Sequence, residues 1–112
     1  MDKLTVYRKI IKRVLADRAD LMRSQPLPGE EVVCLFEDET DNYVLLRFGW
    51  VRGKRLHSIT LHLRLANGKI HVEQDWTEDA VAELVAAGVP KEDIVLAFNP
   101  PETRQHTEFA VA

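Results

Sequence analysis

The chain has 112 residues, a net charge of −3, 46% hydrophobic residues and 29% charged residues, which is the balance of an ordinary globular protein. This apolar content excludes an intrinsically disordered chain, and the negative charge argues against a broad surface that neutralises nucleic-acid phosphates. Apolar runs such as 32–36 and 94–98 fall far short of the roughly 20 residues that span a bilayer, which excludes a transmembrane helix.

The cellular compartment follows from the cysteine count and the N-terminus. Cys34 is the single cysteine, so no internal disulfide forms, and this favours a reducing compartment. Charged residues interrupt the N-terminus from Asp2 onward, which argues against a secretory signal peptide. We expect one cytoplasmic domain over residues 1–112.

The first predicted element is an amphipathic helix over residues 2–22. Its apolar residues recur close to the i, i+3, i+4, i+7 spacing of a helix with one buried face: Leu4, Tyr7, Ile10, Ile11, Val14, Leu15 and Leu21. Pro26, Pro28 and Gly29 then end it, because proline lacks an amide donor and restricts the residue before it.

Four strands follow, at residues 32–36, 43–51, 54–66 and 69–75, and they predict an antiparallel meander. Two short turns join the last three strands. Asn67-Gly68 is the stronger signal, because both residues tolerate the positive φ of a type I′ turn, whereas Arg52-Gly53 places an arginine at such a position.

The Asn67-Gly68 turn also predicts a register and one apolar sheet face. The expected pairs across this turn are Ala66–Lys69, Leu65–Ile70, Arg64–His71, Leu63–Val72, His62–Glu73 and Thr60–Asp75. Across the Arg52-Gly53 turn they are Leu46–Ile59 and Val44–Leu61.

The C-terminal part is expected to be mainly helical. Thr77 is a plausible N-cap for a helix that Gly88 closes, and Pro90 begins a helical turn that leads into residues 94–98. The tail over residues 102–112 is expected to be extended. The fold class is therefore α+β, with an N-terminal helix, a four-stranded meander and C-terminal helices on one face.

His62, His71 and Glu73 raise the possibility of a metal site, because the predicted register places them on one polar face. Two imidazoles and a carboxylate suit zinc, but no fourth ligand is specified. Complementary cross-strand pairs facing solvent are the favoured interpretation. No nucleophile elbow or phosphate-binding loop is present in the sequence, and the apolar neighbours of Cys34 should raise its pKa and keep it unreactive. We expect no enzyme, no metal and no cofactor.

The two tryptophans differ in their surroundings. Trp76 is expected to anchor the core between the last strand and the following helix. Trp50 stands next to the basic residues Arg52, Lys54 and Arg55, where it is either a core residue or part of an interface.

Several segments, taken together, resemble the XisI family over nearly the full length of the chain. They are Met1-Asp2-Lys3-Leu4 with Tyr7-Arg8, Gly49-Trp50, Gly53-Lys54-Arg55, the blocks 69–78 and 88–98, Pro100-Pro101, Arg104 and Phe109-Ala110-Val111-Ala112. The C-terminal half is the most specific part. Asn99 and Glu102 depart from the family pattern, which often has histidine and tyrosine at these positions.

The resemblance implies an α-β4-α architecture and an accessory role. XisI-type proteins are excision-controlling factors for a DNA element that interrupts a nitrogen-fixation gene in cyanobacteria. A separate recombinase cuts and rejoins the DNA in that system, and the XisI-type protein acts with a second accessory protein whose fold looks like an endonuclease. The family brings no catalytic residues to carry over.

The first functional hypothesis is accordingly a non-enzymatic factor that binds an endonuclease-like protein and forms a homodimer or a higher homo-oligomer. The expected interface is the polar sheet face and its rim: Trp50, Ser58, Thr60, His62, Arg64, His71, Glu73 and Asp75. The alternative is a small DNA-binding module that uses the first helix and the basic patch of Arg52, Lys54 and Arg55. The third hypothesis is a metal-dependent enzyme.

Overall fold

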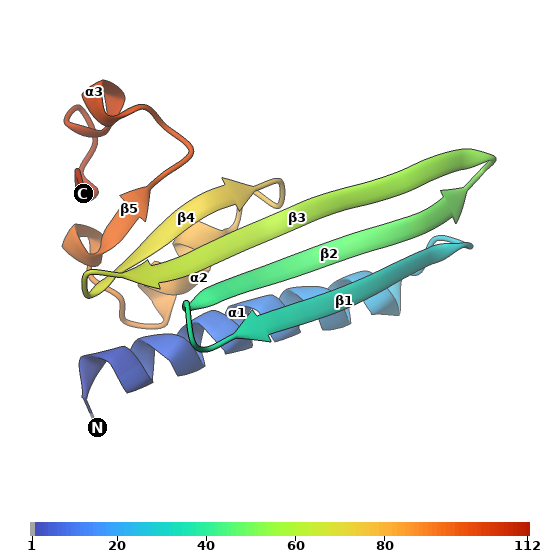
Figure 1. Ribbon diagram of the computed structural model, residues 1–112, viewed down its shortest axis with the longest axis horizontal. Coiled ribbons are helices and arrows are strands. Elements are labelled where there is room, and N and C mark those ends of the chain that lie inside the picture. Colours follow the sequence, from blue (N-terminus) through green and yellow to red (C-terminus); the bar gives the residue numbers. More distant parts are fainter. Residues whose placement is uncertain (1) are drawn as a thin grey trace.

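In the computed structural model, which describes residues 2–112, a long helix lies along one face of an open five-stranded sheet (Figure 1). The strand order is β1-β2-β3-β4-β5, antiparallel except for the β4–β5 pair. The elements are α1 (Lys3–Ser24), β1 (Glu30–Glu37), β2 (Asn42–Val51), β3 (Lys54–Ala66), β4 (Lys69–Asp75), α2 (Ala80–Ala86), the 3₁₀ helix η1 (Lys91–Asp93), β5 (Ile94–Leu96) and α3 (Pro101–Arg104). The α+β class is confirmed, with one strand more than expected.

Helix α1 begins at a side-chain cap and buries one stripe. The Asp2 carboxylate accepts a hydrogen bond from the Thr5 amide at 2.9 Å, which satisfies one of the free donors at the helix start. The buried residues of the stripe are Tyr7, Ile11, Val14, Leu15 and Ala19. This stripe packs on β1, β2 and β3, and α1 also contacts α2. The helix therefore supplies the cover for one sheet face.

Both two-residue turns around β3 have the predicted geometry. Arg52 and Gly53 have φ of 53° and 77°, and Asn67 and Gly68 have φ of 55° and 74°. Positive φ at both central residues is the requirement of a type I′ turn, so the predicted turns are confirmed. Their twist matches that of the flanking strands.

The register across β3 and β4 follows the prediction only near the turn. The confirmed pairs are Ala66–Lys69, Leu65–Ile70, Arg64–His71 and Leu63–Val72. The register then shifts, because β4 has Glu73 as an extra residue in a bulge. The predicted pairs His62–Glu73 and Thr60–Asp75 are therefore wrong, and the observed pairs are His62–Gln74 and Leu61–Asp75.

A second bulge changes which side chains of β2 face the core. The Leu46–Ile59 pair is confirmed, but Thr60 is an extra residue in β3. The predicted Val44–Leu61 pair is wrong, and the observed pairs are Val44–His62 and Leu45–Leu61. Tyr43 and Leu45 are consequently fully buried, whereas Val44 and Leu46 point to the opposite face.

Chain segments after β4 differ most from the expectation. The Asp75 carboxylate accepts hydrogen bonds from the amides of Thr77 and Ala80 at 2.9 and 3.1 Å. It thus caps the start of the helix, which was the role expected of Thr77. Helix α2 begins only at Ala80. This tight turn directs Trp76 outward, where it is 73% exposed, so its predicted place in the core is wrong.

The end of the chain adds a strand and a folded arm. The helical turn expected after Pro90 is found as η1, but residues 94–96, which follow it, form β5 beside β4. The tail is not extended throughout, because α3 and a turn fold it back until Ala110 bridges to Val95. The Arg104 guanidinium donates to the carbonyl oxygens of Asn99, Ala97 and Val111 and so holds this arm together.

Two glycines set the position of β1 against β2. A Cβ on Gly49 would lie 1.9 Å from the Gly29 carbonyl oxygen, and a Cβ on Gly29 would lie 2.0 Å from the Trp50 carbonyl oxygen. Only glycine permits this approach of two backbones, and Gly49 also has a φ of 136°. The start of β1 is therefore fixed by backbone contact.

The core lies between α1, α2 and the sheet. Its largest fully buried side chains include Ile11, Leu15, Tyr43, Leu45, Leu61, Leu63, Ile70, Leu84 and Ile94. In the part of the chain that the structure describes, no helix has both the length and the apolar character needed to cross a membrane.

Candidate interaction surface

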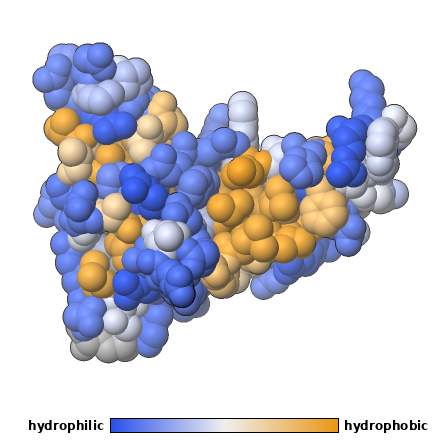
Figure 2. Space-filling model, viewed as in Figure 1, coloured by the Kyte–Doolittle hydropathy of each residue, from blue (hydrophilic) through white to orange (hydrophobic). Residues whose placement is uncertain are grey.

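The sheet face opposite α1 carries a cluster of apolar side chains, here named the outer patch. Strand alternation and the observed register place its six members on this face: Val33 and Leu35 of β1, Val44, Leu46 and Phe48 of β2, and Ile59 of β3. Leu35 is 50% exposed and Ile59 is 40% exposed. Figure 2 shows the patch as a continuous apolar area between hydrophilic ends. Such areas on a single chain commonly mark binding sites.

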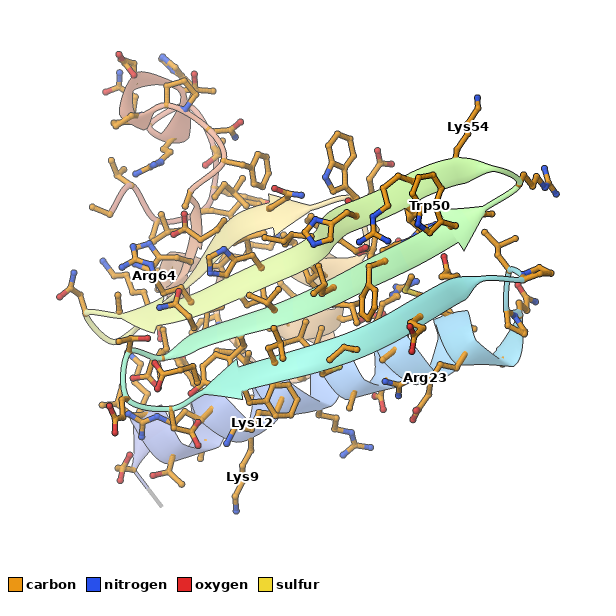
Figure 3. All side chains as sticks on the ribbon, turned by 45° about the vertical axis from the view of Figure 1, so that its right-hand side comes forward. Lys9, Lys12, Arg23, Trp50, Lys54 and Arg64 are labelled. Atoms are coloured by element: carbon orange, nitrogen blue, oxygen red, sulfur yellow. The ribbon has the colours of Figure 1, made fainter. Side chains whose placement is uncertain are left out.

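At one end of the outer patch, the β2–β3 hairpin carries Trp50 and three cations. Trp50 is 62% exposed, and the Arg55 guanidinium lies 5.8 Å from the centre of its ring. Lys54 extends from β3 near the turn (Figure 3). Among residues 2–112, no carboxylate lies within salt-bridge distance of Arg52, Lys54 or Arg55. The three cations of the expected basic patch therefore lie together at a projecting tip.

The other end of the patch is polar and internally paired. Arg64 Nε lies 3.1 Å from Glu73 Oε2, and His62 Nε2 lies 2.9 Å from Asn42 Oδ1. His71 is buried, and burial, together with the charge of Arg64, lowers the pKa of its imidazole. Burial likewise lowers the pKa of His62. Both imidazoles are therefore biased toward the neutral form.

The metal hypothesis finds no ligand set in the described residues. Within residues 2–112, no three His, Cys, Asp or Glu side chains are grouped so that they could hold a metal ion. The bulge at Glu73 is one reason, because it removes the predicted pairing of His62 with Glu73. Cys34 is half-buried, and burial raises the pKa of its thiol, as the sequence predicted.

Three predicted interface residues lie away from the outer face. Ser58 pairs with Arg47, whose guanidinium reaches Glu30 at 2.7 Å on the helix-facing side. Thr60 is the bulge residue and is only 6% exposed. The Asp75 carboxylate turns back to its own chain, as described above. Of the remaining predicted interface residues, Trp50, His62, Arg64 and Glu73 keep exposed surface, whereas His71 is buried.

The basic residues of α1 do not add to the hairpin tip. Arg8 lies 2.7 Å from Asp41, Lys12 lies 3.0 Å from Asp38, and Arg18 contacts carboxylates of α2 and its N-terminal turn. These ion pairs join α1 to neighbouring elements. Lys9 and Lys12 lie on the helix side, away from Trp50 and Arg64 (Figure 3). The first helix and the tip therefore do not form one basic surface.

The outer patch was not predicted, because the predicted register gave the sheet only one apolar face. The signal was present in the consecutive apolar residues of 32–36 and 43–46. Strands without alternation are typical of a sheet that is buried on both faces. Helices α1 and α2 both lie on the side of the sheet opposite the outer patch (Figure 1).

The fold and the outer patch define a small α+β protein with an open sheet. Comparison with known protein families and solved structures gives its family. The model of the XisI protein family matches residues 1–111. The chain therefore belongs to the XisI family, which confirms the resemblance. A XisI-like protein from Anabaena variabilis is similar to it with a TM-score of 0.90 at 30% identity, covering 99% of this chain and 100% of that chain.

A second solved structure is the fdxN element excision controlling factor XisI from Anabaena variabilis. It has a TM-score of 0.82 at 40% identity, again covering 99% of this chain and 100% of the other. No curated protein matches the chain.

Proposed function

We propose that this protein is a non-catalytic accessory factor in the programmed excision of a DNA element. We further propose that it acts by binding an endonuclease-like accessory protein through the outer patch. Membership of the XisI family and the likeness to an excision controlling factor support the role in excision. Cys34 is a free thiol, which suits the reducing cytoplasm where such a factor would act.

The proposed binding mode rests on one observation. Strands β1 and β2 carry apolar side chains on both faces of the sheet, but α1 packs on one face alone. Leu35 and Ile59 are large apolar side chains on a face where residues 2–112 place no helix or strand. Removing such area from water is favourable by about 25 cal/mol per Å². Trp50 and Arg55 at the rim belong to the residue types enriched at binding hot spots.

Affinity capture from the native cells tests the binding mode. The outer-patch variant is Leu35→Asn with Ile59→Asn, which makes two exposed positions polar. The matched control is Leu21→Asn with Leu4→Asn on α1, where the exposed fractions are 53% and 40%. We expect the parent and the control to retain a protein with an endonuclease-like sequence, and the outer-patch variant to lose it.

The same three proteins are then used to complement a strain that lacks the gene, and excision of the element is measured by amplification across the joined ends. Loss of excision in the outer-patch variant alone supports both parts of the proposal. Equal capture by all three proteins would refute the outer patch as the binding site. Normal excision in the strain without the gene would refute the excision role itself.

DNA binding is the second candidate, and the unpaired cations of the hairpin tip favour it. Three cations release few counterions, so we expect weak, sequence-independent binding that is lost at about 150 mM salt. Fluorescence anisotropy with duplex DNA measures this. Sub-micromolar affinity that persists at about that salt concentration would place DNA binding ahead of protein binding.

A further inference from the structure

The edge of β3 that faces away from β2 is only partly covered. Strand β4 pairs with Leu61 to Ala66, so the segment 54–60 of β3 has a strand neighbour on the β2 side alone. Figure 1 shows β3 continuing beyond the end of β4 to the turn without a second neighbour. Edges of this kind are templates for pairing with another chain.

The turn geometry specifies which backbone groups are free on this edge. Val51 and Lys54 flank the two-residue turn and exchange hydrogen bonds, so alternate residues Arg55, His57 and Ile59 direct their N–H and C=O groups away from β2. The Gln74 side chain donates to the Ile59 carbonyl oxygen, and the Trp76 amide donates to that of Thr60 at 2.9 Å. These two contacts mark the closed end of the free edge.

The two ends of the free edge carry opposite charges. The turn end holds the cations Arg52, Lys54 and Arg55. The closed end holds Glu78, which is exposed and follows the exposed Trp76 by two residues in the sequence. A shallow pocket of about 210 Å³ lies there, lined by Gln74, Asp75, Trp76 and Phe98. His57 stands at the middle of segment 54–60.

An arrangement of this kind is complementary to itself. A two-fold axis at His57 would pair β3 antiparallel with β3 of a second copy, and would bring the cationic turn of each copy to the acidic and aromatic end of the other. Cations over aromatic rings and opposite charges across strands are both favourable. We propose that this free edge of β3 is the interface of a symmetric homodimer with one continuous sheet.

The other sheet edge is protected against the same pairing. On β1, the Glu30 amide already donates to the Leu27 carbonyl oxygen at 3.0 Å, and the Arg23 guanidinium donates to the Val32 carbonyl oxygen at 2.8 Å. Glutamates stand at both ends of β1, so an antiparallel pair of β1 strands would place like charges together. The charges therefore favour pairing of two copies through β3 and disfavour pairing through β1. A dimer formed through β3 leaves the outer patch free. The inference does not rest on the proposed function.

Sedimentation velocity of the full chain, over a range up to high micromolar concentration, tests the interface. We expect a reversible dimer for the parent. His57→Pro removes an amide that points away from β2, so it should abolish the dimer and leave the hairpin intact. Circular dichroism reports whether this variant is folded.

Charge reversal provides the second test and does not depend on the proline. Lys54→Glu and Glu78→Lys should each weaken the dimer, and the two changes combined should restore it. Glu31→Lys on β1 is the matched control and should leave association unchanged. A monomeric parent at all concentrations overturns the proposal. A folded, dimeric His57→Pro variant, or a combined charge reversal that fails to restore a dimer lost in both single variants, overturns it as well.

Discussion

The two faces of the sheet are built from the same strands and the same kinds of residue, yet only one of them is a core. On the helix side, Tyr43 and Leu45 of β2 are fully buried under α1. On the other side, their neighbours Val44 and Leu46 belong to the outer patch. The two faces differ because α1 covers one of them, and not because their side chains differ in kind. An apolar face is therefore no proof of a core within the same chain.

The charges of the two sides differ in the same way. On the helix side, Arg8 and Lys12 pair with carboxylates of the β1–β2 loop, and Arg47 pairs with a Glu30 carboxylate that is only 5% exposed. On the outer side, Arg55 contacts Trp50 and has no carboxylate partner in the described chain. One face thus has its charges satisfied internally, and the other presents charge at its rim.

Alanine at two successive leucines measures the contrast directly. We expect Leu45→Ala to lower the free energy of unfolding by about 2–5 kcal/mol, because it empties a fully buried site. Leu46→Ala on the outer face should lower it by about 1 kcal/mol. Urea denaturation of both variants gives the two values. Equal losses would mean that the outer face is packed like a core.

Alanine at Gly49 tests whether backbone contact fixes the register that separates the two faces. Its Cβ would meet the Gly29 carbonyl oxygen, so we expect a loss of about 1–3 kcal/mol from strain alone. Gly53→Ala is the control, since no atom lies within 4 Å of its Cβ and only the positive φ opposes it. A Gly49 variant that melts at the parental temperature would contradict the contact.

Lowering the pH should first weaken the ion pairs on the helix side of the sheet. The hydrogen bond from Arg8 holds the pKa of Asp41 below its usual value. A lowered folded-state pKa adds stability above the unfolded value near 3.8, and this stability is lost as the pH falls below it. Asparagine tolerates the left-handed backbone of this position, so Asp41→Asn should reduce the fall in the urea midpoint between neutral pH and about pH 3. If the urea midpoint of the Asp41→Asn variant falls with pH as much as that of the parent, the Arg8–Asp41 ion pair does not contribute to the loss of stability in acid.

The smallest effect on stability is expected for a charge exchange on the outer side. Arg64→Glu combined with Glu73→Arg keeps an ion pair between half-exposed side chains, so the change should stay below about 1 kcal/mol. Partner capture should nevertheless weaken, because the order of charges at the rim is inverted. Circular dichroism and affinity capture measure the two effects. Unfolding of the variant would show that Arg64 and Glu73 belong to the core.

The sequence predicted the elements that depend on local rules. Helix α1, both type I′ turns and the first pairs beyond Asn67-Gly68 follow from spacing and from φ preferences, and they are found as expected. The pairing failed at Thr60 and Glu73, because a bulge adds one residue without any special residue type to announce it. The prediction that Val44 and Ile59 face the core failed with it.

Only the rim of the candidate interaction surface follows from the sequence. Trp50, Arg55, Arg64 and Glu73 were identified from local charge and alternation, but the apolar centre was assigned to the core. Burial depends on which face α1 covers, and this is set by packing between distant segments. Strand β5 was missed for a similar reason, because a three-residue strand gains its pairing only from β4.

The two short turns around β3 also bear on the order in which the chain folds. Each turn closes the smallest possible loop, so pairing of β3 with β2 and β4 loses little chain entropy, whereas β5 and α1 join residues far apart in sequence. We expect the β2–β3–β4 hairpins to form first and to display both sheet faces before α1 docks. Pulsed hydrogen exchange during refolding, with the amides of β3 protected earliest, is the matching observation, and earliest protection of β5 would reverse this order.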